Sequence, residues 1–373
     1  MIAAHTDVVG SLLRPPYLLD ARRKLADSAI SCAAFKALED RAVNEAVSLQ
    51  EEAGLEVVTD GEMRRLSFQS QLPEAVAGFG EFDLDAFLWG DWSGDADTGN
   101  SSLERPRNLG VVDRLARRRH LCAEELTYLR GRTDRIAKVS LPSPSLWANF
   151  WSAELSGHVY PTLDSFLADV ADILRQEVAE LVRLGATYIQ LDAPHYPLLL
   201  NPETRAFYES RGWTLKRWLD AGVELDNAVI GGADDAGASI TFGMHLCRGN
   251  QGSRWLVEGA YDEVAAHIFA RTHVQRLLLE YDDARSGGFE ALRQVPDDKM
   301  VVLGLVTTKT GRLEPTRELV ARVREASRFF PLEQLAVSPQ CGFASSIVGN
   351  RLTPQDQRRK LSRVTETATA VWG

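Results

Sequence analysis

The chain has 373 residues, of which 45% are hydrophobic and 25% are charged, and this composition is typical of a globular protein. The length is sufficient for one large α/β barrel or for two medium-sized domains. The formal net charge of -10 argues against a general nucleic-acid-binding surface and favours an acidic enzyme.

The sequence shows no targeting or membrane segment. Its N-terminus, "MIAAHTDVVGS", lacks the charged and apolar regions of a signal peptide. No window reaches the roughly 18 apolar residues that a membrane span needs. The four cysteines are too few for a disulfide framework in a chain of this size. We therefore expect a cytoplasmic protein with reduced thiols and no membrane or nucleic-acid partner. Its oligomeric state is left open, a homo-oligomer included.

Short apolar, β-branched runs alternate along the chain with longer stretches of helical period. In chain order the runs occupy residues 7–11, 56–62, 136–144, 188–194, 240–247, 276–283, 300–309 and 335–342. Amphipathic segments such as 162–185 and 313–330 lie between them. Eight strands alternating with helices predict a single (β/α)8 TIM barrel over residues 1–373. A doubly wound sheet is the alternative, but no G-x-G-x-x-G follows an early strand.

One long segment, residues 78–108, interrupts this alternation and is rich in Gly, Asp and Ser. Long irregular loops within compact domains are often functional. The other interpretation is a loop insertion on the surface, with a small hairpin around Trp89 and Trp92. The sequence does not decide between the two.

Polar side chains gather where the predicted strands end, and the active site of a barrel lies at that face. His245 and Cys247 stand two residues apart in one strand, so both point into the barrel. Glu280 and Cys341 end two other strands. Zinc binds cysteine, histidine and carboxylate ligands that converge from several elements. Together these four residues predict a zinc site, although the His-x-Cys pair alone would not.

Six ordered motifs extend over nearly the whole chain and resemble those of the cobalamin-independent methionine synthase family, in its C-terminal catalytic barrel and its short single-barrel relatives. The motifs are "GSLLRP", "VTDGEMRR", "IQLDAP", "HLCRGN", "LEYDDARSGGFEAL" and "SPQCGF". The resemblance implies a zinc cofactor held by the four residues named above. It also implies that Ser11, Glu62 and Asp192 hold the amino-acid part of homocysteine. Zinc would keep the acceptor thiol as a thiolate at neutral pH.

The chain departs from the family pattern at two positions. Ala193 stands where the synthases carry a second acidic residue after the aspartate. The family's catalytic histidine after the seventh strand is replaced by "TTK", which ends at Lys309. Lys309 could act as an acid, bind an anion, or be a surface lysine. His195 and His5 are other candidates for the proton donor.

The resemblance thus implies a zinc-dependent transferase that moves a methyl or alkyl group from a small-molecule donor to a homocysteine-type thiol. Methylcobalamin, a corrinoid protein, methylfolate and an epoxide remain open as donors. An epoxide:thiol transferase of the coenzyme M type is the nearest alternative. A zinc hydrolase is disfavoured because the site contains two cysteines. A metal-independent decarboxylase on the same barrel would leave His245, Cys247 and Cys341 unexplained.

Overall fold

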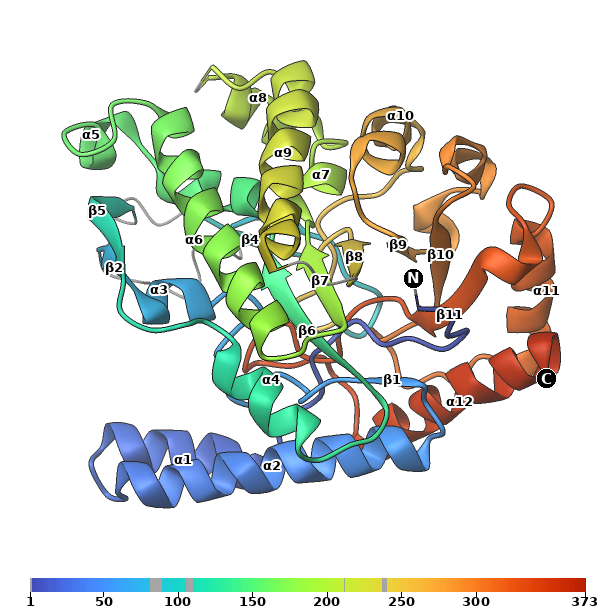
Figure 1. Ribbon diagram of the computed structural model, residues 1–373. Coiled ribbons are helices and arrows are strands. Elements are labelled where there is room, and N and C mark those ends of the chain that lie inside the picture. Colours follow the sequence, from blue (N-terminus) through green and yellow to red (C-terminus); the bar gives the residue numbers. More distant parts are fainter. Residues whose placement is uncertain (1, 81–88, 105–109, 211, 237–239) are drawn as a thin grey trace.

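The computed structural model describes residues 2–80, 89–104, 110–210, 212–236 and 240–373. A seven-stranded parallel sheet with the order β1-β6-β7-β8-β9-β10-β11 forms its centre (Figure 1). The strands are β1 Val57–Val58, β6 Ile136–Pro142, β7 Tyr188–Asp192, β8 Thr241–Leu246, β9 Arg276–Glu280, β10 Met300–Val306 and β11 Leu335–Pro339. Each of these strands lies within one of the predicted apolar runs, and these seven predictions are confirmed.

The run at residues 7–11, predicted as the first strand, contains no strand in the structure. It lies between the two outer strands of the sheet. Thr6 forms an isolated parallel bridge with Val337 of β11, and the Leu12 N–H donates to the carbonyl of Gly61, beyond β1, at 3.0 Å. The fold is therefore a mixed α/β fold with a curled parallel sheet, consistent with a TIM-like barrel.

Helices surround the sheet (Figure 1). The α-helices of two turns or more are α1 Pro16–Ala26, α2 Cys32–Glu52, α4 Ala123–Arg130, α6 Leu163–Arg183, α8 Pro202–Glu209, α9 Leu215–Ile230, α10 Asp262–Arg271, α11 Thr316–Ala326 and α12 Pro354–Trp372. The shorter ones are α3 Gln71–Ala75, α5 Ala153–Ser156 and α7 His195–Leu198. The 3₁₀ segments are η2 Pro144–Phe150, η3 Gly231–Ala236, η4 Ala284–Ser286, η5 Glu290–Gln294 and η6 Leu332–Gln334. In the described part of the chain, none of these helices combines the length and the apolar character that a bilayer span requires.

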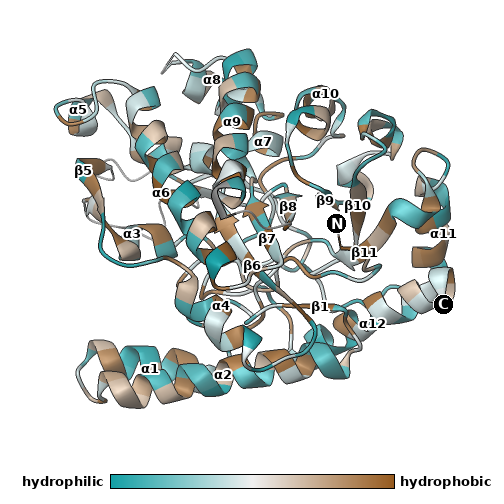
Figure 2. Ribbon diagram, viewed as in Figure 1, coloured by the Kyte–Doolittle hydropathy of each residue, from teal (hydrophilic) through white to brown (hydrophobic). Residues whose placement is uncertain are grey.

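The sequence pattern of α6 explains its place against the sheet. The Thr162 side chain caps its first turn in a capping box with Ser165. Buried positions such as Phe166, Val170 and Leu174 recur at helical spacing and face the core. Figure 2 shows the resulting alternation of hydrophobic and hydrophilic residues along the helices. The predicted helical segments 162–185 and 313–330 are both confirmed, as α6 and α11.

Two small antiparallel pairs belong to the segment 78–108 and its flanks. β3 Gly90–Trp92 pairs with β4 Ser101–Leu103, and β2 Val76–Phe79 pairs with β5 Val111–Arg117. A hairpin therefore includes Trp92 and begins directly after Trp89. Residues 81–88 and 105–109 of this segment lie outside the described residues.

Candidate metal and substrate site

A cavity opens at the carboxyl ends of the parallel strands, where a barrel enzyme carries its active site. Its described lining combines strand ends with the β3–β4 hairpin and the start of α8. Six residues expected at the site line this cavity, namely Ser11, Glu62, Asp192, His245, Cys247 and Cys341. The structure thus brings together residues that are up to 330 positions apart in the chain.

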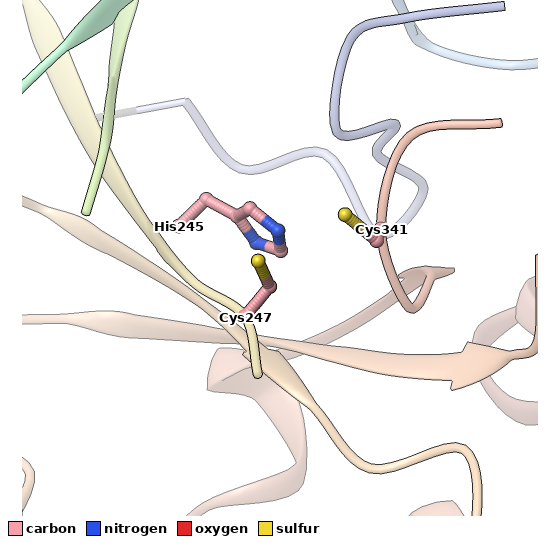
Figure 3. Close-up of side chains that lie close together, drawn as sticks. All are labelled: His245, Cys247 and Cys341. Atoms are coloured by element: carbon pink, nitrogen blue, oxygen red, sulfur yellow. The ribbon is translucent and has the colours of Figure 1, made fainter. Parts of the chain in front are cut away.

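Three of these side chains form a compact group at the cavity. His245 and Cys247 come from the end of β8, and Cys341 follows β11 (Figure 3). All three are buried, and their ligand atoms lie within 4.8 Å of one another. β8 and β11 are separated by two strands in the sheet, so a flat sheet would hold them about 14 Å apart. The curl of the sheet is what brings the ligands together.

The chemistry of this group fits a zinc ion. The Nδ1 atom of His245 lies 3.3 Å from the Leu278 carbonyl, while its Nε2 is buried and has no hydrogen-bond partner among the described residues. A backbone carbonyl on one ring nitrogen is the usual way to orient a histidine whose other nitrogen binds metal. The hydrogen bond from Cys247 lowers the pKa of Cys341 well below that of a free thiol. Imidazole nitrogen and cysteine sulfur are ligands that zinc prefers.

Glu280, the fourth expected ligand, lies outside this compact group. Its Oε1 accepts a hydrogen bond from Arg285 Nη2 at 2.6 Å, and its Oε2 accepts one from the Arg248 N–H at 3.0 Å. Burial alone would raise the pKa of Glu280, but the charges of Lys309 and Arg285 bring it down to about 2. The carboxylate is therefore ionised, and it is held by cations of the protein.

Lys309 is buried, so the interpretation as a surface lysine is wrong. Its Nζ lies 3.9 Å from Oε1 of Glu280 and 3.5 Å from both the Gly249 carbonyl and Asn250 Oδ1. Lys309 is not among the cavity-lining residues that the structure describes. Its ammonium group faces Glu280 from behind the site.

Glu62 is held in a conformation that residues with a side chain rarely adopt, with φ at 54°. The Asp60 carboxylate accepts from its N–H at 2.8 Å, and Arg14 donates to its carbonyl at 2.8 Å. Its Oε1 accepts from the Ser140 hydroxyl at 3.0 Å, while its buried Oε2 has no partner among the described residues. Strain of this kind persists where the surroundings impose it, commonly at binding sites.

Ser11 and Asp192 are the other two residues expected to bind substrate. Asp192 Oδ1 accepts from Gln190 Nε2 at 2.7 Å, and burial raises the pKa of Asp192 to about 7. The Ser11 hydroxyl lies against Gly342, where an added Cβ would stand 2.0 Å from its oxygen. A glycine is therefore required beside Cys341 for Ser11 to reach the cavity.

The structure brings neither of the two expected histidines to the cavity. His195 lies behind the lining; its Nε2 is 2.8 Å from the Ser145 hydroxyl, and its ring packs on Tyr196. Burial lowers the pKa of His195 to about 3, which leaves it neutral. His5 lies at the opposite end of the sheet, where its Nδ1 is 2.8 Å from the carbonyl of Leu335, the first residue of β11.

The sequence interpretation missed the arginines that organise the site. Arg248 is fully buried, donates to the Glu280 carbonyl at 3.0 Å, and lies over the Tyr261 ring. Arg285 binds the Glu280 carboxylate. Both stand within the quoted motifs "HLCRGN" and "LEYDDARSGGFEAL". The sequence signal that could have identified them is the position of Arg248 directly after Cys247 and of Arg285 five residues after Glu280.

Residues 4–353 match the family described as the cobalamin-independent synthase catalytic domain. The chain belongs to this family. The resemblance seen in the six motifs is thereby confirmed. The family's cobalamin-independent chemistry does not support the methylcobalamin or corrinoid-protein donor that the sequence had left open.

Relatives and solved structures match over most of their length. The uncharacterized protein YxjG of Bacillus subtilis is 34% identical over 99% of this chain and 94% of its own. A methionine synthase of Pyrococcus abyssi is 27% identical over 90% of this chain and 85% of its own. A B12-independent methionine synthase from Shewanella sp. W3-18-1, solved with selenomethionine, has a TM-score of 0.71 at 20% identity, and the match covers 100% of this chain and 98% of that one. This last likeness shows a shared fold.

Proposed function

We propose that this protein is a zinc-dependent methyltransferase that transfers a methyl group to the sulfur of homocysteine or a closely similar amino-acid thiol. The observation that carries the proposal is the convergence of His245, Cys247 and Cys341 on one cavity that Glu62 and Asp192 also line. Membership of the cobalamin-independent synthase family supports the same reaction class.

The three clustered residues would hold the zinc ion, with Glu280 as a nearby carboxylate. When bound, zinc lowers the pKa of a thiol, so the acceptor sulfur would be a nucleophile at neutral pH. Two thiolate ligands make the metal less Lewis acidic, so a zinc-bound acceptor sulfur would keep electron density for attack on carbon.

Glu62 and Asp192 are placed to hold the ammonium group of the acceptor. An ammonium donates three hydrogen bonds, and a charge-assisted bond to a carboxylate is among the stronger ones in proteins. The unpartnered Oε2 of Glu62 supplies one acceptor at the cavity. We assign the acceptor's carboxylate to the neighbourhood of Ser11.

Lys309 serves this site as a positioning residue. Its ammonium group lies 3.9 Å from the Glu280 carboxylate and outside the described cavity lining. From there it stabilises the ionised Glu280 beside the metal group. His195, buried against Ser145, supports the wall behind Asp192 rather than exchanging protons with substrate.

The experiment that tests the proposal measures zinc and homocysteine together. The purified protein should contain about one zinc per chain, and calorimetry should show that the zinc-loaded protein binds homocysteine. Cys247→Ser or Cys341→Ser should remove most of the zinc, whereas the control Cys32→Ser, at an exposed cysteine, should not. Full zinc content in both site variants, or no binding of homocysteine to the zinc-loaded protein, contradicts the proposal.

We further propose that residues 7–11 occupy the eighth strand position of a (β/α)8 barrel and close the sheet. Residues 1–373 would then form one catalytic domain. The bridge from Thr6 to Val337 and the hydrogen bond from Leu12 to Gly61 support this closure on both sides. The Thr59 hydroxyl adds a bond to the Gly10 carbonyl at 2.7 Å.

A further inference from the structure

The acidic and basic side chains that line the described part of the cavity are all acidic. Among the lining residues that the structure describes, four are carboxylates and none is a lysine or an arginine. The carboxylates are Glu62, Asp91, Asp192 and Glu203. A cavity of this kind attracts cations and repels anions, because low-dielectric walls concentrate the field of the side chains that line it.

Two of these carboxylates are not needed by the thiol acceptor. Asp91 lies on β3, and Glu203 lies in the first turn of α8. Both side chains are exposed, and among the described residues no ion pair is found for either of them. They stand on β3 and α8, outside the central sheet, whereas Asp192 ends β7 and Glu62 follows β1. The outer part of the cavity therefore has negative charge of its own.

Aromatic and apolar side chains line the same cavity. Trp89 and Trp92 line the cavity from the hairpin segment, and Leu146 and Leu198 line it from η2 and α7. The Trp89 ring is fixed by packing on Phe207 at a centroid distance of 4.9 Å. Indole faces attract cations, including those whose charge is surrounded by methyl groups.

We infer that the methyl donor of this enzyme is a methylsulfonium cation. The inference rests on the proposed function, since it names the second substrate of the same site. A sulfonium combines a positive charge with an apolar surface, as this wall of indoles and carboxylates requires. A donor with several carboxylates would meet the negative charges of Glu62, Asp91 and Glu203, with no lysine or arginine among the described lining residues to bind it.

The chemistry of this donor balances without further reactants. The acceptor thiolate sulfur forms a bond to the methyl carbon while the bond from that carbon to the sulfonium sulfur breaks. The electron pair of the broken bond stays on the departing sulfur, which leaves as a neutral thioether. One negative and one positive charge disappear together, so no proton is delivered to the leaving group. This agrees with a cavity whose described lining offers no lysine and whose buried His195 lies behind the wall.

Binding can be measured separately from turnover. Calorimetry at low ionic strength should show that dimethylsulfoniopropionate binds the protein at least about tenfold more tightly than 3-methylthiopropionate, which has the same carboxylate but an uncharged thioether in place of the sulfonium. S-methylmethionine should bind with an affinity similar to that of dimethylsulfoniopropionate. Triglutamylated methyltetrahydrofolate should bind more weakly than either sulfonium. In turnover with homocysteine, a ¹³C-methyl group of the sulfonium should appear in methionine by mass spectrometry.

Two variants test the assigned residues. The double variant Asp91→Asn, Glu203→Gln should weaken sulfonium binding about tenfold at low salt and less at high salt, with homocysteine binding unchanged. Trp89→Leu should weaken sulfonium binding about fivefold. Asp97→Asn is the control for Asp91→Asn alone, because each removes one negative charge from an exposed position in the same hairpin, and Asp97 does not line the cavity.

The outcomes separate this inference from the proposed function. If homocysteine is methylated from the folate but not from either sulfonium, the inference is wrong and the proposed function stands. If homocysteine does not bind, the proposed function is wrong, while sulfonium affinity still tests the cavity. Equal affinity for dimethylsulfoniopropionate and for 3-methylthiopropionate overturns the inference. So does an unchanged affinity of the double variant for the sulfonium. A quaternary ammonium that binds equally well and donates its methyl group faster also overturns it.

Discussion

Glu62 shows how the sequence prepares a side chain for a polar ligand. Its positive φ is imposed by Asp60 on its N–H and Arg14 on its carbonyl. Gly10 leaves room for the side chain, because a Cβ at that position would lie 2.6 Å from Glu62 Oε1. The motifs that contain Gly10 and Glu62 therefore have one physical purpose, which is to aim a carboxylate into the cavity.

Replacing Glu62 by glutamine should weaken the binding of an amino-acid thiol. The substitution keeps the shape and removes the charge that pairs with the acceptor's ammonium group. We expect the KM for homocysteine to rise at least about tenfold, which corresponds to about 1.4 kcal/mol. The control substrate is 3-mercaptopropionate, which has no ammonium group and whose KM should not rise. Equal losses for both thiols would show that Glu62 acts on the fold or the metal instead.

Asp226 predicts a dependence of stability on pH. The Ser143 and Tyr196 hydroxyls each donate to its carboxyl group at 2.6 Å, and burial raises the pKa of Asp226 from 3.8 to about 7. The folded state therefore binds a proton between about pH 4 and 7 that the unfolded state releases. The contribution of Asp226 to the free energy of unfolding is fully present below pH 4. It is lost as the pH rises through 7, and the loss is up to about 4 kcal/mol.

Urea denaturation at several pH values measures this effect. The free energy of unfolding of Asp226→Asn should fall less between pH 5 and 8 than that of the native protein, because asparagine has no proton to release. Parallel pH profiles for the two proteins would show that Asp226 titrates normally in the fold.

At the scale of the elements, a buried ionic cluster attaches the N-terminal segment to the sheet. The Asp7 carboxylate accepts from Lys138 Nζ at 2.8 Å and from the Tyr188 hydroxyl at 2.9 Å, and it lies 3.2 Å from Arg276. These partners belong to β6, β7 and β9. The Asp7 side chain thus attaches the segment to three strands with which its backbone forms no bridge.

Removing Asp7 should destabilise the protein strongly. Asp7→Ala leaves Lys138 and Arg276 buried without their counter-charge, and breaking such buried pairs costs about 3–5 kcal/mol. The change should appear as a lower urea midpoint with a similar slope. Asp20→Ala, which removes an exposed aspartate paired with Lys24 in the same helix, is the control and should change the midpoint little. A small effect of Asp7→Ala would mean that the cluster does not hold the segment.

The sequence was sufficient to predict seven of the strands and the convergence of His245, Cys247 and Cys341, but it wrongly predicted a strand at residues 7–11 and did not predict the partners of Glu280. Buried parallel strands are continuous apolar runs, as in Met300–Val306, so periodicity locates them. The run at residues 7–11 has the same composition, but its register depends on side-chain bonds to distant strands. Likewise, the carboxylate of Glu280 follows the conformation of Arg285, which a strand pattern does not determine. The sequence did not predict a role for Trp89, because its ring packs on Phe207 of α8, which is distant in the chain.

At the scale of the whole molecule, the proposed metal ligands come from the middle and the outer edge of the curled sheet. His245 and Cys247 end β8 in the middle of the sheet, while Cys341 follows the outer strand β11, next to the N-terminal segment. A zinc ion held by all three would therefore connect elements that hydrogen bonds of the ladder join only through β9 and β10. We expect its binding to stabilise the native fold as a whole.

Removal of zinc should accordingly lower the Tm of the protein while leaving its far-UV circular dichroism unchanged. A ligand that binds only the folded state stabilises it by about 4 kcal/mol when its free concentration is a thousand times its Kd. For a chain of this size such a change corresponds to a Tm shift of several degrees, which scanning calorimetry with and without a chelator measures.

Cys341→Ser should lower the Tm and abolish its response to zinc, because it removes the ligand that follows β11. Cys32→Ser, on the exposed start of α2, should respond like the native protein. A Tm that is independent of zinc in the native protein would show that the three side chains do not bind the ion together.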